Sequence, residues 1–301
     1  MTKKIAVIND LSGFGRCSLT AAISVISAMG IQACPLPTAI LTAQTGYPHY
    51  YLDDYTDKMD IYRQEWQKMG QHFDGIYTGF VASEAQIDQI FHFIDTFYTS
   101  DTFLLVDPVM GDDGIKYDMF TPKLLEKMNA LVREADIITP NLTELCLLTD
   151  ADYDAIIDIA DTRILIDVIG ELASTLLPPD SDNSNTLDSR QTSKKEKEII
   201  VTGIHCKNEH GQKMMGNLYV SKDTRKLFAF PHVGGSYSGT GDLFASCIAA
   251  GKCRGDGIPE LIQLSGTFLE QAIKDSAEEN VPYPDGTNYE KYLSMNSFSD
   301  S

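Results

Sequence analysis

The 301-residue sequence lacks several features that indicate whole classes of protein. No apolar run approaches the roughly 20 residues that a membrane-spanning helix needs, so no membrane partner is expected. Six cysteines are present without a Cys-x-x-Cys pair, which favours neither zinc nor a disulfide framework and predicts a reduced, cytoplasmic protein. The first ten residues hold too short an apolar stretch for a signal peptide and predict a β-strand instead.

Basic residues are also scarce. Lys and Arg number 24 against 43 Asp and Glu, which gives a formal net charge of −19. Outside Lys194-Lys195-Glu196-Lys197 there is no basic cluster of useful size, so a nucleic acid is not an expected partner. An acidic chain that binds an anionic nucleotide has to concentrate positive potential locally. Backbone amides, helix N-termini and a divalent metal can supply it.

Apolar runs rich in β-branched residues alternate with amphipathic helical patterns. This alternation predicts an α/β fold with a largely parallel central sheet flanked by helices. The predicted strands are residues 5–9, 32–39, 75–78, 103–107, 136–139 and 198–202, followed by an antiparallel pair at 216–221 and 226–230. The predicted helices are residues 18–29, 54–73, 84–99, 122–134, 142–148, 155–176, 240–253 and 259–278.

One segment, residues 178–197, breaks the alternation. It holds one apolar side chain in twenty residues and cannot bury enough surface to offset its ordering entropy. We therefore expect a disordered surface insertion within a single domain spanning residues 1–301, rather than a domain boundary. Residues 297–301 are expected to form a frayed tail.

The stretch Gly239-Thr240-Gly241-Asp242 stands at the start of a predicted helix. Glycines allow the backbone to turn its amides toward one point, and a helix N-terminus adds positive potential, which together suit a phosphate. A carboxylate repels a phosphate, so Asp242 needs a reason to be there. Proton abstraction from an attacking hydroxyl is the best one. The alternative is a loop with an ordinary helix cap.

Two common phosphate-binding motifs are missing. The loop after the first strand has Ser18 where a dinucleotide fingerprint has its third glycine, and no Gly-Lys-Ser/Thr sequence occurs. Ligands of open α/β sheets bind outside the carboxyl ends of strands, so Asp10 and Ser12 are placed to meet a substrate. A simple polar turn remains the alternative for Ser12.

Three other strand ends carry polar residues. Asp107 ends an apolar strand and is well placed to hold Mg²⁺, directly or through water. Asn141 and Glu144 have the spacing of a helix capping box; alternatively, Glu144 binds water on the metal while Asn141 lies beside the phosphates. Thr202 and Gly203 are placed to border a nucleotide, although such strand ends are common.

A loop after the second strand contains Thr45, Gly46 and Tyr47. Thr45 and Gly46 can offer a hydroxyl and a backbone amide to a polar ring, and Tyr47 can cover that ring. Residues of these types also make many ordinary loops.

Taken in order, these motifs resemble the ribokinase-like superfamily, and within it the pyridoxal (pyridoxine, pyridoxamine) kinases. The likeness runs from about residue 4 to residue 255 and rests on Thr45-Gly46-Tyr47, Tyr77-Thr78-Gly79-Phe80 and residues 107–112, 139–144 and 239–244. It implies a three-layer sandwich, a homodimer, and ATP-dependent phosphorylation of the 5′-hydroxymethyl group of a B6 vitamer with Mg²⁺. A monovalent cation is left open.

The resemblance also implies a role for each candidate residue. Asp242 is the general base, and the amides of Gly239, Thr240 and Gly241 form the anion hole. Asp107 and Glu144 serve the metal. The residues expected to bind the nucleotide are Asp107, Asn141, Glu144, Thr202, Gly203, Gly239 and Gly241. The residues expected to bind the vitamer are Asp10, Ser12, Thr45, Gly46, Tyr47, Phe80 and Asp242. Two departures stand out: Asp10 replaces a serine common in the family, and Phe80 replaces a frequent tyrosine.

Two alternatives remain. Hydroxymethylpyrimidine kinases of thiamine synthesis accept a similar hydroxymethyl group, but they typically have Cys after Gly-Thr-Gly, where this chain has Asp242. A non-catalytic B6-binding protein would have no use for a carboxylate at the anion site.

Overall fold

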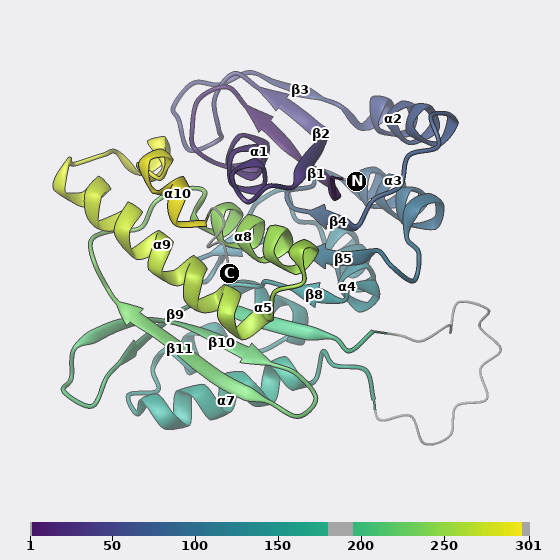
Figure 1. Cartoon of the computed structure of the whole chain (residues 1–301). Coiled ribbons are helices and arrows are strands. Elements are labelled where there is room, and N and C mark those ends of the chain that lie inside the picture. Colours follow the sequence, from purple (N-terminus) through teal and green to yellow (C-terminus); the bar gives the residue numbers. More distant parts are fainter. Residues whose placement is uncertain (1, 180–194, 297–301) are drawn as a thin grey trace.

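The computed structural model describes residues 2–179 and 195–296 (Figure 1). A nine-stranded sheet in the order β11-β10-β9-β8-β5-β4-β1-β2-β3 forms its centre. The strands are β1 (Lys4–Ser12), β2 (Gln32–Leu41), β3 (Leu52–Asp54), β4 (Gly75–Thr78), β5 (Phe103–Val106), β8 (Ile137–Ile138), β9 (Glu198–Lys207), β10 (Lys213–Val220) and β11 (Arg225–Pro231). Pairing is parallel from β2 to β9 and antiparallel at both edges. A separate hairpin joins β6 (Gly111–Asp112) to β7 (Ile115–Lys116).

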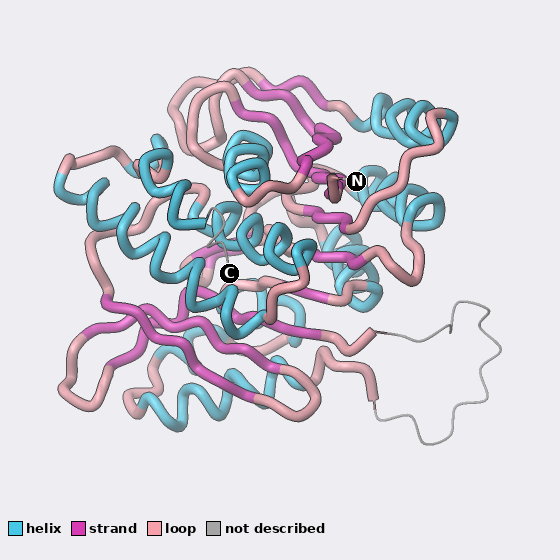
Figure 2. The backbone as a smooth tube through the Cα atoms, in the orientation of Figure 1, coloured by secondary structure: helices cyan, strands magenta, loops and turns pink. Residues whose placement is uncertain are grey.

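Helices cover both faces of this sheet (Figure 2). One layer contains α1 (Ser18–Ala28), α8 (Thr240–Arg254) and α9 (Ile258–Glu278). The opposite layer contains α2 (Thr56–Lys68), α3 (Glu84–Phe97), α4 (Pro122–Glu134), α5 (Leu142–Thr149), α6 (Tyr153–Ile157) and α7 (Thr162–Ser174). The chain continues after α9 through the short helices η1 (Tyr283–Asp285), η2 (Glu290–Tyr292) and α10 (Leu293–Asn296). The predicted three-layer α/β arrangement is confirmed.

The central strands are apolar along their length because both of their faces are buried. In β1, Ile5 and Val7 pack into the cluster beneath α1 and α8, whereas Ala6 and Ile8 pack into the opposite cluster. All four side chains are fully buried. Such near-continuous apolar runs are typical of parallel strands covered on both sides, which is why the sequence pattern predicts them well.

Two predicted helices differ from the structure. The helix predicted at 155–176 is divided into α6 and α7, because Asp161 is the N-cap that starts α7 as a separate helix. Its side chain accepts hydrogen bonds from the amides of Arg163 and Ile164. The helix predicted at 54–73 begins only at Thr56, because residues 52–54 pair with the edge of β2 as β3.

The predicted insertion at 178–197 lies for the most part outside the described residues, and the predicted tail at 297–301 lies outside them entirely. Two lysines at the end of the insertion are described. Lys195 donates a hydrogen bond of 2.6 Å to the carbonyl of Thr102, and the buried Lys197 donates to the carbonyl of Val132. The chain is therefore already packed against the sheet when it reaches β9.

Within residues 2–179 and 195–296, no helix has the length and apolarity to cross a bilayer. All six cysteines are free. The carboxyl ends of the parallel strands β1, β4, β5 and β8 meet at one edge of the sheet, where α1, α5 and α8 also begin. In open α/β sheets this edge is where ligands bind.

Candidate active site

Asp242 lies in the first turn of α8, half-buried at this edge of the sheet. Its Oδ1 accepts a hydrogen bond of 3.0 Å from Nδ2 of Asn9, and the carboxylate also accepts one from the backbone amide of Ser18. Burial raises the pKa of Asp242 to about 6, although the Ser18 and Asn9 hydrogen bonds act in the opposite direction. The end of β1 and the first turns of two helices therefore meet at one carboxylate.

The glycines before Asp242 have different structural requirements. Gly239, the N-cap of α8, has a φ of 82°, and a Cβ there would lie 2.2 Å from the carbonyl oxygen of Arg16. The glycine loop therefore packs directly on the chain that enters α1. A Cβ on Gly241 would meet nothing within 4 Å, so this side is open. The first amides of a helix have no intrahelical acceptor, which leaves those of α8 available to an anion.

Asn9 is a site residue that the sequence reasoning did not select. It is fully buried, and while its Nδ2 donates to Asp242, its Oδ1 accepts from the amides of Phe80 and Asp10, each at 2.9 Å. A Cβ on Gly79 would lie 2.4 Å from Nδ2 of Asn9, so glycine is needed there. The sequence feature that could have identified Asn9 is its position as a polar residue inside the apolar run of β1.

The structure places Asp10 and Ser12 together at the end of β1. Ser12 is fully buried, and its hydroxyl donates a hydrogen bond of 2.9 Å to Oδ2 of Asp10. Burial raises the pKa of Asp10, and hydrogen bonds from Ser18 and Ser12 oppose this shift. Ser12 therefore orients the carboxylate of Asp10 instead of standing as an open polar turn.

Asp107 follows β5, which is separated from β1 by β4, and it is near enough to Asp242 to be affected by its charge. Its Oδ1 accepts a hydrogen bond of 2.8 Å from the hydroxyl of Thr139. Burial raises the pKa of Asp107 to about 7, and the negative charge of Asp242 contributes to the shift. Neither carboxylate, nor that of Glu144, forms an ion pair with Lys or Arg in the described part of the chain.

Asn141 and Glu144 form the capping box that their spacing predicts. The Asn141 side chain accepts from the amide of Glu144 at 2.8 Å, and Oε2 of Glu144 accepts from the amide of Asn141 at 2.8 Å. Oε1 of Glu144 accepts from the amide of Met110, and Nδ2 of Asn141 donates to the carbonyl of Gly111. Both side chains thus fix the loop after β5 to the start of α5. The buried Glu144 also lies near Asp107, whose charge, after burial, raises the pKa of Glu144.

The remaining predicted residues lie on either side of this centre. Thr202 pairs with Asn141 in an isolated parallel bridge, and Gly203 follows it, exposed, with a φ of 71°. Thr45 and Gly46 are exposed, whereas the half-buried Phe80 is joined to Asn9 through its amide.

The segment after α9 is a second part of the site that the sequence reasoning missed. Oη of Tyr47 donates a hydrogen bond of 2.6 Å to Oδ1 of Asp285. The amide of Ser238, next to the glycine loop, donates to the carbonyl of Tyr283 at 3.2 Å. The sequence Tyr283-Pro284-Asp285-Gly286 indicates a turn, but a turn pattern does not reveal where the turn docks.

Comparison with known proteins identifies the family. The phosphomethylpyrimidine kinase family matches residues 15–176 and 171–283, which together cover most of the chain. The chain belongs to this family. Together with the relatives described next, this result confirms the predicted resemblance to the pyridoxal kinases and the ribokinase-like fold.

Three relatives illustrate the similarity. The crystal structure of a "putative phosphomethylpyrimidine kinase" from Bacteroides thetaiotaomicron with pyridoxal is 32% identical, with a TM-score of 0.83 and coverage of 98% of this chain and 96% of that one. Pyridoxal kinase from Lactobacillus plantarum is 24% identical, covers 98% and 97% of the two chains with a TM-score of 0.79, and supports the fold alone. A "putative pyridoxal kinase" of Schizosaccharomyces pombe is 28% identical over 194 residues, which are 64% of this chain but only half of that protein.

The packing of the glycine loop yields a prediction about stability. Gly239→Ala should lower the free energy of unfolding by about 2 kcal/mol or more, because alanine is strained at positive φ and its Cβ overlaps the Arg16 carbonyl. Gly241→Ala, two residues away, is the matched control and should stay within about 0.5 kcal/mol of the original protein. Urea unfolding measures both. Equal losses in the two variants would contradict the close packing at Gly239.

Proposed function

We propose that the protein is an ATP-dependent kinase that phosphorylates the 5′-hydroxymethyl group of a B6 vitamer, in the salvage of pyridoxal 5′-phosphate. The observation that carries the proposal is the Asp242 carboxylate, held beside the free amides of a helix N-terminus at the ligand-binding edge of the sheet. A relative that is 32% identical over almost the whole chain was solved with pyridoxal. Pyridoxal is a pyridine ring that carries a hydroxymethyl group of the kind this site would phosphorylate.

In this reaction Asp242 acts as the general base for the attacking hydroxyl. The hydrogen bonds from Asn9 and Ser18 hold its carboxylate in one orientation. The amides of Gly239, Thr240 and Gly241 stabilise the charge on the transferred phosphoryl group. Phosphoryl transfer depends mainly on positioning and on charge stabilisation, and backbone dipoles can supply both without a lysine-containing phosphate loop.

The nucleotide would bind along the ends of β5, β8 and β9, near Asn141, Thr202 and Gly203. Mg²⁺ fits this region because Asp107 and Glu144 are buried carboxylates without a Lys or Arg partner among the described residues. No group of three or more His, Cys, Asp or Glu arranged as a metal site occurs in residues 2–179 and 195–296, so water and phosphate oxygens would complete the coordination. Glu144, whose oxygens each accept an amide, would act through water. When bound, the metal neutralises phosphate charge.

The vitamer would bind on the other side of Asp242. Asp10 and Phe80 lie next to each other through their shared contacts with Asn9, and Ser12 supports Asp10. Thr45, Gly46 and Tyr47 would cover the ring. A homodimer and a cytoplasmic location belong to the same proposal. The first follows from the resemblance to pyridoxal kinases, and the second agrees with six free cysteines.

A substrate assay tests the proposal directly. With Mg²⁺ and ATP, pyridoxal should be consumed with a kcat/KM at least about tenfold above that for hydroxymethylpyrimidine, because the Thr45-Gly46-Tyr47 loop and Asp242 resemble those of the B6 kinases, although Asp10 and Phe80 depart from them. Mass spectrometry of the product should show one added phosphate. A preference for the pyrimidine would overturn the substrate assignment, and no ATP consumption with either compound would overturn the kinase assignment.

Replacement of the base tests the mechanism. Asp242→Asn keeps the size of the side chain but removes proton acceptance, so turnover should fall by about 10²- to 10⁴-fold. Pyridoxal affinity by calorimetry should change less than about threefold, because the ring contacts remain. Asp223→Asn, in the exposed turn between β10 and β11, is the charge-matched control and should behave as the original protein. Full turnover in Asp242→Asn would remove Asp242 as the base.

The pH profile gives a second view of the same group. The base must be deprotonated, and burial raises the pKa of Asp242 to about 6. The value of kcat/KM should therefore decline toward about tenfold per pH unit as the pH falls below this region, and should level off above it. Initial rates with pyridoxal at on the order of ten pH values between 5 and 8 would resolve the decline of kcat/KM at low pH. A profile that stays flat down to pH 5 would contradict the assignment.

A further inference from the structure

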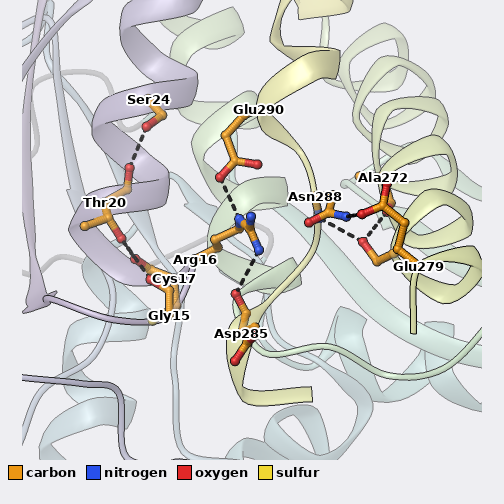
Figure 3. Close-up of polar contacts among 11 residues, drawn as sticks. Gly15, Arg16, Cys17, Thr20, Ser24, Ala272, Glu279, Asp285, Asn288 and Glu290 are labelled. Atoms are coloured by element: carbon orange, nitrogen blue, oxygen red, sulfur yellow. Dashed lines mark hydrogen bonds and ion pairs between the residues drawn. The ribbon is translucent and has the colours of Figure 1, made fainter. Parts of the chain in front are cut away.

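Residues 282–287, which lie between α9 and η2, run from the end of α9 to the segments that precede α1 and α8. We refer to residues 282–287 as the C-terminal strap. Its far end is anchored: the amide of Asn288 donates to Oγ of Ser276 at 2.8 Å, and Nδ2 of Asn288 donates to Oε2 of Glu279 (Figure 3). Thr287 and Tyr289 are buried. The C-terminal end of the strap is therefore held against the last turn of α9.

One side of the strap contacts the glycine loop and the entry to α1. The carbonyl of Asp285 accepts hydrogen bonds from the amide and from Nη1 of Arg16, whose Nε also pairs with Glu290 (Figure 3). Gly286 has a φ of 75°, and a Cβ there would lie 2.8 Å from Cβ of Arg16 and 3.1 Å from the carbonyl oxygen of Ser238. The strap is thus pressed against the segment that precedes Gly239.

Its other side contacts the loop that carries Thr45 and Gly46. Nε2 of Gln44 donates to the carbonyl of Pro284 at 3.1 Å, and Oη of Tyr47 donates to the Asp285 carboxylate at 2.6 Å. The hydrogen bonds of the Gly46 and Tyr47 amides stay within the loop, since both end on Gln44. Thr45, Pro48 and His49 are exposed. Gln44 and Tyr47 therefore both join this largely exposed loop to the strap, and Tyr47 is the residue that contacts Asp285.

We propose that Asp285 is a positioning residue for the vitamer: it holds the Tyr47 ring and its loop over the acceptor pocket, at a fixed place relative to the glycine loop. The inference rests on the proposed function, because it assumes that this loop meets the B6 ring. It assigns Asp285 to acceptor binding and not to phosphoryl transfer. The hydrogen bond from Tyr47 to Asp285 also raises the pKa of the phenol to about 12.

Steady-state kinetics separate this role from a general structural one. Asp285→Ala and Tyr47→Phe should each raise KM for pyridoxal by about tenfold, the expected loss for a charge-assisted hydrogen bond, with kcat and KM for ATP within about twofold. The double variant should be no worse than either single variant, because both remove one interaction. Asp285→Asn keeps an acceptor oxygen and should restore most of the affinity.

The control is Glu290→Gln, which breaks the exposed ion pair with Arg16 but leaves the Tyr47 contact intact. It should leave KM for pyridoxal unchanged, since such pairs contribute little. Additive effects in the double variant, or equal changes in KM for ATP and pyridoxal, would overturn the proposal. If Asp285→Ala proves unstable, Tyr47→Phe decides the question, because its ring packing is retained.

Hydrogen exchange provides a readout that does not depend on activity. In the protein without ligand, amides of residues 43–51 should exchange at least about fivefold faster in Asp285→Ala than in the original protein, while those of β1 and α8 stay unchanged. Unchanged exchange in residues 43–51 would overturn the tie between strap and loop. If the original protein does not phosphorylate pyridoxal, the proposed function fails. If it does, and KM for pyridoxal is unaltered in both single variants, only the role of Asp285 fails.

Discussion

The negative charge of the half-buried Asp242 has to be held near three buried carboxyl groups, and the local structure of the site follows from that constraint. A buried charge is costly unless it is hydrogen-bonded. Here the donors come from distant parts of the chain, Asn9 at the end of β1 and Ser18 at the start of α1. Ser18 adopts a φ of 51°, unusual for a residue other than glycine. Such a conformation persists only where the surroundings enforce it, and it commonly marks a functional site.

The glycines around the site serve the same arrangement. Gly79 leaves the space that the Asn9 amide occupies, and Gly239 allows the loop before α8 to lie on the carbonyl of Arg16. Either close approach would be impossible with a Cβ. The site is therefore assembled where β1, the loop after β4 and the loop before α8 pack closely together, and the Asn9 side chain that bonds to Asp242 depends on this packing.

Electrostatics shows what so acidic a chain needs in order to bind the anionic nucleotide of the proposed reaction. Asp10, Asp107 and Glu144 are buried near Asp242, and desolvation raises the pKa of each. Burial and mutual repulsion make this group of carboxyls a region that favours cations and protons. With a net charge of −19, an approaching polyphosphate would otherwise be repelled. In the proposed function, the amides of α8 and a divalent cation would supply positive potential, since none of the ion pairs among the described residues joins Asp107, Glu144 or Asp242 to a lysine or arginine.

Much of the fold and part of the site could be predicted from the sequence, because those features depend on local patterns. The parallel strands follow from apolar runs, and Asp10, Asp107 and Asn141 gather because the carboxyl ends of parallel strands share one edge. The spacing of Asn141 and Glu144 was enough to predict their capping box. Asn9 was missed because a single polar residue inside an apolar strand does not reveal which distant residue it contacts. The contact between Tyr47 and Asp285 joins residues 238 positions apart, and no local rule reveals it.

The two halves of the site are built by different means, and this has a consequence for specificity. The proposed phosphate side consists of strand ends and helix N-termini, whose geometry is fixed by backbone hydrogen bonds and by a core packed on both faces of the sheet. The proposed acceptor side adds to Asp10 and Phe80 an exposed loop that side chains attach to the C-terminal strap. Loops on a rigid scaffold tolerate substitution far better than the scaffold does. In the proposed function, changes in residues 44–49 and 282–286 would therefore alter which ring is accepted while Asp242 and the amides of α8 stay in place, as expected where one fold serves several substrates.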